Sequence, residues 1–320
     1  MKIEKEATHL EKSDIIAEMP IACADEKAAV EFFEKRLWNG TAKCAHCQST
    51  KVYQMVDAKT GERNKRFLWR CHDCKGQFTV RIATVLEESR LPLRHWVYAF
   101  WRASTSKKGV SALEIQRQCQ ISYKSALFLM HRIRFAMTPD IGTSAKMPGV
   151  VEVDETYIGG KPRPGTGFHS RGRGTKKTPV LGIVERGGRV HRRVVADVTG
   201  RTLKSAVRQM VHESATIMTD EYVAYRGIEA SFDGGHHVVN HRRKEYVRGD
   251  VSTNTAESSF ALIKRGLMGI YHAVSKKHLH RYLGEFDFRW NTRSLNDGDR
   301  TEQAVKGAAG KRLDYQRCIA

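Results

Sequence analysis

Two pairs of cysteines share the same internal spacing in the first quarter of the chain. Cys44 and Cys47 form one pair, Cys71 and Cys74 form the other, and 23 residues separate the pairs. A tetrahedral Zn²⁺ site needs four soft ligands, and two such turns deliver two thiolates each. The spacing therefore predicts a zinc ribbon, with a β-hairpin between the pairs and a structural metal. Free cysteines and a redox pair are the alternatives.

Three acidic residues stand beside short apolar segments in the second half of the chain. Asp154 lies within a strand-like segment, Asp220 follows another, and Glu257 lies in a segment with helical periodicity. Three carboxylates that converge from two strands and a helix can hold two divalent ions about 4 Å apart, which suits phosphodiester chemistry. Mg²⁺ fits such a site because it prefers oxygen ligands. Spacing alone leaves open that these are surface acids in ordinary ion pairs.

The helical segment around Glu257 carries two more polar residues that bear on this site. Lys264 follows Glu257 by seven positions, so the two side chains share one face of the helix, two turns apart. Asn254 precedes Glu257 by three positions and is suited to cap the helix.

The distribution of charge points to a polyanionic partner. The chain carries 55 Lys and Arg against 35 Asp and Glu, a formal charge of +20. Residues 1–40 hold six basic and nine acidic residues, so the remainder carries +23. Nucleic acid is the simplest such partner, because basic loops bind the phosphate backbone. The candidate contacts are Lys161, Arg163, Arg171, Arg173, Lys176 and Lys177 in a Gly- and Pro-rich loop, and Arg242, Arg243 and Lys244 in a second cluster.

A pair of helices is expected at residues 111–118 and 122–137, with Ser122 as the cap of the second. In a helix-turn-helix motif the second helix offers its first residues to DNA, and here these include Tyr123 and Lys124. An ordinary helical hairpin is the alternative.

The pattern of elements predicts an α/β fold for the second half of the chain. Strand-like segments at 150–159, 179–186 and 189–198 precede a helix at 201–213 and a strand at 215–220. A helix near 221–229, a strand near 236–240 and helices at 254–268 and 275–293 complete the domain. The expected division is an acidic helical segment at 1–40, a zinc ribbon at 41–90, a helical domain at 91–138, a linker at 139–149, a catalytic domain at 150–295 and a tail at 296–320.

The sequence contains no apolar segment of the length that a membrane span needs, and its first residues lack the apolar core of a secretion signal. We therefore expect a soluble, cytoplasmic protein with no membrane partner.

The motifs together resemble those of the IS1595-type insertion-sequence transposases, which carry an ISXO2-like transposase domain behind a zinc ribbon. The matching segments are the two cysteine pairs with GQFTVRIATVLEESRLPLRHW (76–96), VDETYIGGK (153–161), TDEYVAY (219–225), TNTAESSFALIKRGLMGIYH (253–272) and HLHRYLGEFDFRWNTR (278–293). Their order and spacing agree with that family from about residue 25 to 293. The resemblance thus covers most of the chain.

The resemblance implies an RNase H-like core with DDE-type chemistry. Asp154 would be the first metal ligand and Asp220 the second. Some members carry Asn and others Glu at the third position, so Glu257 and Asn254 are both candidates. Glu257 is preferred, because a basic residue seven positions later, here Lys264, contacts transposon-end DNA in this kind of enzyme.

The activity implied is cleavage at the transposon ends followed by transfer of the freed 3′-OH into target DNA, with two Mg²⁺ (or Mn²⁺) ions in the catalytic site and one structural Zn²⁺. The partners implied are the terminal inverted repeats, target DNA and further copies of this chain. An inactive zinc-ribbon and helix-turn-helix regulator is one alternative, and a metal-dependent nuclease of the same fold is another.

Overall fold

The computed structural model describes residues 15–139, 145–160, 175–240, 243, 245 and 247–314. The chain forms two compact units, one of residues 1–137 with 294–320 and one of residues 138–293. Within the described ranges, no helix combines the length and the apolar character needed to cross a bilayer. The six-part division expected above is finer than these two units and stays a prediction.

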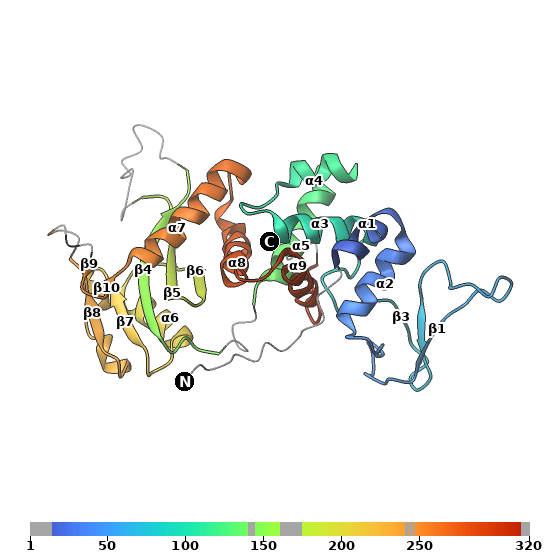
Figure 1. The fold of residues 1–320 in the computed structure, drawn as a ribbon, viewed down its shortest axis with the longest axis horizontal. Coiled ribbons are helices and arrows are strands. Elements are labelled where there is room, and N and C mark those ends of the chain that lie inside the picture. The colour runs from blue at the N-terminus through green and yellow to red at the C-terminus, as the bar shows by residue number, and fades with distance from the viewer. Residues whose placement is uncertain are drawn as a thin grey trace, which may run out of the picture. The chain divides into compact units, whose positions relative to one another are not determined.

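The first unit is mainly helical (Figure 1). Short polar side chains start its helices by accepting a hydrogen bond from a free backbone N–H group. The Asp25 carboxylate accepts from Ala28 N at 2.7 Å, and the Ser122 hydroxyl accepts from Ser125 N at 3.1 Å, which confirms the predicted cap. The helices are α1 (Ile15–Ala24), α2 (Glu26–Leu37), α3 (Leu93–Thr105), α4 (Ala112–Cys119), α5 (Tyr123–Met137) and α9 (Asp297–Lys306).

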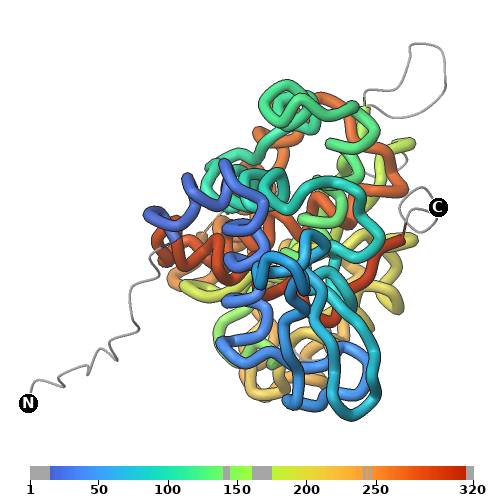
Figure 2. The backbone as a smooth tube through the Cα atoms, turned by 90° about the vertical axis from the view of Figure 1, so that its right-hand side faces the viewer, coloured from blue at the N-terminus to red at the C-terminus, as the bar shows by residue number. Residues whose placement is uncertain are grey.

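Between α2 and α3 the chain runs mostly in loops and very short strands, seen in blue and cyan in Figure 2. The strands β1 (Val52–Gln54), β2 (Trp69–Cys71) and β3 (Gln77–Phe78) pair antiparallel in the order β1-β2-β3. The hairpin of β1 and β2 lies between the cysteine pairs, as predicted. Trp38 and Trp69 pack edge-to-face against each other beside the buried Phe78, so a small aromatic cluster backs the cysteines.

The second unit is built on a five-stranded mixed sheet, ordered β6-β5-β4-β7-β8. Its three adjacent strands β6, β5 and β4 run antiparallel, whereas β4, β7 and β8 run parallel to one another. The strands are β4 (Val150–Ile158), β5 (Thr178–Glu185), β6 (Val190–Val194), β7 (Thr216–Thr219) and β8 (His236–Val238); β9 (Val247–Arg248) and β10 (Val251–Ser252) form a separate pair.

Helices cover both faces of this sheet. Alternate side chains of a strand point to opposite faces, so Leu181 packs with α6 (Gly200–Met210) and its neighbour Val180 packs with α7 (Asn254–Gly266) and α8 (Leu279–Asn291). A Cβ added at Gly182 would lie 2.6 Å from the Phe260 ring. Glycine at this position therefore lets α7 approach β5 closely.

Several element predictions needed correction. Instead of a helix near 221–229 the chain forms two 3-10 turns, η1 (Val223–Tyr225) and η2 (Glu229–Ser231), because Gly227 between them has a φ of +78°. The single helix predicted at 275–293 is divided into a 3-10 turn, η5 (Lys276–His278), and the helix α8. α7 passes into a π-helical turn, η4 (Leu267–Tyr271). α1 lies within the expected acidic helical segment at 1–40, whereas the predicted tail contains the helix α9, which groups with the first unit.

Candidate functional site

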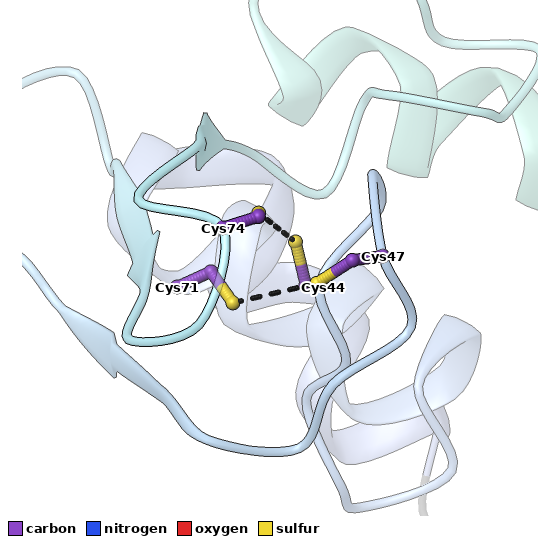
Figure 3. Close-up of side chains that lie close together, drawn as sticks. All are labelled: Cys44, Cys47, Cys71 and Cys74. Atoms are coloured by element: carbon purple, nitrogen blue, oxygen red, sulfur yellow. Dashed lines mark hydrogen bonds between the residues drawn. The ribbon is translucent and has the colours of Figure 1, made fainter.

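The four predicted zinc ligands come together at the turns that precede β1 and follow β2. Their sulfur atoms all lie within 4.8 Å of one another, with Cys44 Sγ 3.5 Å from Cys74 Sγ and Cys47 Sγ 3.6 Å from Cys71 Sγ (Figure 3). Tetrahedral Zn–S bonds of about 2.3 Å place sulfur atoms about 3.8 Å apart. The donor set and its size therefore fit a structural Zn²⁺.

Backbone groups of the second turn favour the charged form of one of these thiols. N–H groups of Cys74 and Asp73 lower the pKa of the Cys71 thiol, which favours the thiolate that zinc binds. Cys44 and Cys71 are buried, whereas Cys47 and Cys74 are exposed. The cluster thus sits at the surface of the ribbon, with one thiol of each pair facing inward.

The topology of the sheet brings two of the predicted acids to one edge. β4 and β7 are parallel neighbours, and their register pairs Glu152 with Met218. Asp154 and Asp220 each lie two positions further along, so the register places Asp154, in the middle of β4, level with Asp220, just beyond the carboxyl end of β7. Ligands collect at such edges because parallel strands all end there.

The third acid reaches the same edge from α7. Partial burial, and then the negative charges of Glu155, Asp220 and Glu257, raise the pKa of Asp154 to about 8. The three predicted acids are therefore within electrostatic range of one another. Their oxygen atoms do not all come within 4.8 Å, the separation that the four cysteines satisfy.

Lys264 stands on the exposed face of α7 with Glu257, as the seven-residue spacing predicted. Burial lowers the pKa of Lys264, the carboxylate of Asp154 raises it, and the charge of Lys177 lowers it. These influences place both lysines close to the acids. By contrast, Asn254 is the exposed first residue of α7, and its side chain does not cap the helix.

The cap of α7 is instead Glu152, which lies two positions before Asp154 on β4. Its fully buried carboxylate accepts hydrogen bonds from Thr255 N at 2.7 Å, Ala256 N at 3.0 Å and Thr255 Oγ1 at 3.0 Å. Arg186 donates to the same carboxylate from Nε at 2.7 Å and also binds Ser252 Oγ at 2.7 Å. Glu152 therefore fixes the start of α7, and with it Glu257, against the strand that carries Asp154.

A second supporting group lies on the opposite face of β4. The hydroxyl of the buried Tyr225 donates to Glu155 Oε2 at 2.9 Å. Tyr222 N donates to Asp220 Oδ1 at 3.1 Å, and the two tyrosine rings pack edge-to-face at 6.1 Å. Tyr225 and the backbone of Tyr222 therefore hold the carboxylates of Glu155 and Asp220 in place.

The structure describes about half of the predicted DNA-binding side chains. Lys176 is exposed beside the half-buried Lys177, Arg243 is exposed near β8, and Tyr123 and Lys124 are exposed in the first turn of α5. α4 ends at Gln120, whose left-handed φ of +53° turns the chain into α5. Outside the described residues lie Lys161, Arg163, Arg171, Arg173, Arg242 and Lys244.

Comparison with known families agrees with this organisation. Residues 146–291 match the ISXO2-like transposase domain, and residues 24–77 match the transposase zinc-ribbon domain. The first match holds the three acids, and the second holds the four cysteines. The chain thus carries both domains of the IS1595-type transposases, which confirms the family predicted from its motifs and supports a transposase role.

Among individual proteins, the chain is similar to the uncharacterized protein in transposable element ISH50 of Halobacterium salinarum. The two are 29% identical over 287 residues, which cover 85% of this chain and 93% of the relative. No solved structure matches the chain.

Proposed function

We propose that this protein is a DDE-type transposase whose catalytic acids are Asp154, Asp220 and Glu257. The observation that carries the proposal is the position of these acids at one sheet edge, where burial, then the charge of Glu155, and then the charges of Asp220 and Glu257 raise the pKa of Asp154 to about 8. Such repulsion between uncompensated carboxylates is relieved when a cation binds between them. The three acids lie in the domain that matches transposases, and metal-dependent phosphodiester chemistry is expected of such a domain.

The sheet supports an RNase H-like core. Three antiparallel strands are followed by two parallel ones in the order β6-β5-β4-β7-β8, with α6 on one face and α7 and α8 on the other. In this core the first acid belongs to the central strand, the second follows the neighbouring parallel strand, and the third belongs to a later helix. Asp154, Asp220 and Glu257 occupy these positions.

Two Mg²⁺ (or Mn²⁺) ions would be held by the three carboxylates, and they would activate the attacking oxygen and stabilise the leaving one. The residues of the chain supply the rest. Glu152 fixes the start of α7, the helix that carries Glu257, against β4. Lys264 and Lys177 offer positive charge beside the acids, where they would hold the phosphates that flank the cleaved bond.

The reaction proceeds in two phosphoryl transfers. Water attacks the phosphorus at the transposon end, the P–O3′ bond breaks, and the released 3′ oxygen takes up a proton. The 3′-OH then attacks a phosphorus of target DNA, so that a new P–O3′ bond forms as the target's own bond breaks. Because two ends must be cut and joined together, we expect a homo-oligomer on the terminal inverted repeats and target DNA, acting at the nucleoid in the cytoplasm.

The basic side chains around this edge define the proposed path of DNA. Lys176 and Lys177 end the basic loop that follows β4, and Arg243 follows β8. In the first unit, Tyr123 and Lys124 at the start of α5 are the proposed contacts of a helix-turn-helix-like pair. On sequence grounds we propose six further DNA contacts: Lys161, Arg163, Arg171, Arg173, Arg242 and Lys244.

Strand cleavage and joining on a duplex with the element's terminal inverted repeat, in Mg²⁺, tests the proposal. Asp154→Asn, Asp220→Asn and Glu257→Gln should each abolish both steps and leave DNA binding largely intact. An active Glu257→Gln enzyme together with an inactive Asn254→Ala enzyme would assign the third position to Asn254 instead. Cleavage without joining would identify a nuclease, and binding without cleavage by the wild-type protein would identify a regulator.

A further inference from the structure

The side chain of Arg186 joins two segments that are distant from each other in the sequence. Arg186 follows β5, and its Nε donates to Glu152 Oε1 on β4 at 2.7 Å. The other two nitrogens of its guanidinium bind the β9–β10 hairpin, at the carbonyls of Asp250 and Ser252 and at Ser252 Oγ, the last at 2.7 Å. Because the guanidinium is a rigid planar fork, these bonds fix the hairpin at a defined position beside β4.

The carboxylate that receives Arg186 also holds the start of α7. Glu152 is fully buried and accepts hydrogen bonds from Thr255 N and Ala256 N in the first turn of that helix. If the guanidinium is withdrawn, a buried carboxylate loses its counter-charge, and its hold on the helix changes with it. The hairpin and the first turn of α7, which carries Glu257, therefore depend on one ion pair.

The hairpin lies beside β7 and β8 (Figure 1). Its inner strand β10 is half-buried, whereas its outer strand β9 is exposed. Val247 is 54% exposed, and 61% of the Arg248 side chain is exposed although Arg248 also binds the carbonyl of Val238. In the sequence, residues 242–248 hold four basic residues and one acid, Glu245, for a net charge of +3. An exposed cationic strand of this kind suits the phosphate backbone of DNA.

We propose that Arg186 is a positioning residue that couples the β9–β10 hairpin to α7, so that DNA bound on the hairpin holds Glu257 more firmly at the acidic edge. The inference rests on the proposed function and adds to it a response of the catalytic site to its substrate. Two states differ at Arg186: a docked hairpin, as in the structure, and a released one that leaves Arg186 with Glu152 alone. DNA that contacts Arg248 and Lys264 together favours the docked state, because only a fixed hairpin allows both contacts at once.

Coupling of this kind is reciprocal. DNA on the hairpin should lower the Mg²⁺ concentration that the acids need, and a divalent ion at the acids should tighten the binding of DNA by the same factor. The coupling is also separable from the ion pair itself. A lysine in place of Arg186 keeps a positive charge for Glu152, but its ammonium is a single point charge and lacks the fork that reaches the hairpin at the same time.

Amide hydrogen exchange in the absence of divalent ions tests the coupling without turnover. The amides of Thr255 and Ala256 are the groups that Glu152 holds, so their exchange reports directly on the start of α7. Binding of the terminal-repeat duplex should slow their exchange about tenfold in the wild-type protein, which is within the usual range of coupling between two sites. Equal exchange with and without bound duplex would overturn the inference.

Two substitutions should remove this slowing for different reasons. Arg186→Lys keeps the charge opposite Glu152 and loses the hairpin, so the duplex should still bind but no longer slow exchange in α7. Arg248→Ala removes the phosphate contact on β9, so exchange should equal that of the wild type without DNA and should stay unslowed with it. Thermal denaturation checks that both variants fold. Slowing that persists in both variants would mean that DNA acts on α7 by another route, and the inference would be wrong.

Arg189 supplies a matched control three positions from Arg186. It lies in the turn before β6, and its guanidinium donates to the carbonyl of Ala145 at 2.8 Å instead of to Glu152. Arg189→Lys should therefore retain both the DNA-dependent slowing and cleavage. If this variant loses the slowing as well, the effect belongs to the turn in general, and the specific role of Arg186 is overturned.

Cleavage measures the same coupling through the metal requirement. At saturating duplex, Arg186→Lys and Arg248→Ala should each raise the Mg²⁺ concentration for half-maximal cleavage several-fold, while the rate at high Mg²⁺ stays close to that of the wild type. The double variant should need no more Mg²⁺ than Arg186→Lys alone, because the two residues act in series. Effects that multiply in the double variant would show that the two residues act independently, which would overturn the coupling.

The outcomes separate the coupling from the proposed function. If the wild-type protein does not cleave, the proposed function fails, whereas the exchange measurement still decides the coupling, since it needs neither metal nor turnover. If the wild-type protein cleaves and the duplex does not slow exchange in α7, the coupling alone is wrong. If exchange in α7 slows with rising protein concentration in the absence of DNA, the hairpin receives a second copy of the chain, and the inference is wrong as well.

Discussion

The zinc cluster and the acidic edge are two candidate metal centres built on different principles. The four thiols come from two short turns, and their sulfur atoms all lie within 4.8 Å of one another. The acids come from two strands and a helix spread over about a hundred residues, and burial together with neighbouring negative charges raises the pKa of Asp154. The first site is formed by local turns, whereas the second depends on supports that hold like charges together.

Loss of zinc should have the largest effect on stability. Structural zinc contributes on the order of 10 kcal/mol to small domains, so a strong chelator at pH 7 should disorder the ribbon and expose Trp38 and Trp69. Metal analysis and tryptophan emission measure this. Cys74→Ser should lower zinc content, while Cys119→Ser, which lies outside the cluster, should not. A purified protein with four titratable thiols and no zinc would contradict the ribbon assignment.

Substitution of an acid should separate activity from stability. Asp154→Asn should reduce cleavage at least about thousandfold, because a metal ligand is lost. It should leave the free energy of unfolding unchanged or higher, since it removes a carboxylate that its neighbours repel. Denaturant unfolding without divalent ions measures the second effect. A clear destabilisation would mean that Asp154 has a structural partner in the folded state.

Removal of the cap of α7 should affect both properties. Glu152→Ala leaves two N–H groups of α7 and the guanidinium of Arg186 without their carboxylate, which should cost about 3 kcal/mol of unfolding free energy. Glu152→Gln should cost less and should need more Mg²⁺ for half-maximal cleavage. Glu185→Gln, at the nearby end of β5, is the control and should change neither quantity.

Lys264→Ala should weaken the binding of DNA and leave the stability of the fold unchanged. We expect about tenfold weaker binding of the terminal-repeat duplex and a salt dependence reduced by about one ion, because one phosphate contact is lost. Titrations at several salt concentrations measure both. Arg265→Ala is the control, since the Arg265 guanidinium binds the carbonyl of Ala261 on its own helix. Equal effects of the two substitutions would remove the specific role of Lys264.

The smallest effect is expected at the tyrosine that supports the edge. Tyr225→Phe removes the hydrogen bond to Glu155, which should cost about 1 kcal/mol and lower cleavage only a few-fold. Thermal unfolding and single-turnover rates measure these changes. A loss as large as that of Asp154→Asn would give Tyr225 a direct part in the chemistry.

The two regions also differ in how far the sequence predicted them. The ribbon was predictable residue by residue, because a turn with two intervening residues brings its own cysteines together whatever lies around it. The acids were identified partly by family resemblance, since spacing alone left them as possible ion-pair residues. The helix at 254–268 was found from its apolar periodicity, but its cap was wrongly sought in Asn254.

Support residues escaped prediction because their partners are distant in the chain. Glu152 caps a helix that starts about a hundred residues later, and Tyr225 binds a carboxylate seventy residues before it. No local pattern marks such pairs. The break at Gly227 was also missed, because a glycine in a polar segment is compatible with a helix until its φ is known.

The sequence by itself determined the zinc ligands, the two-sided pattern of the sheet and the family of the chain, because each depends on local spacing or on motifs in order. Only the tertiary structure decided which strands are neighbours and therefore which acids meet. The parallel pairing of β4 with β7 sets Asp154 level with Asp220, and the capping of α7 by Glu152 fixes the start of the helix that carries Glu257. Long-range pairing of this kind follows from packing of the whole sheet, since many distant contacts must form together before any one of them is stable.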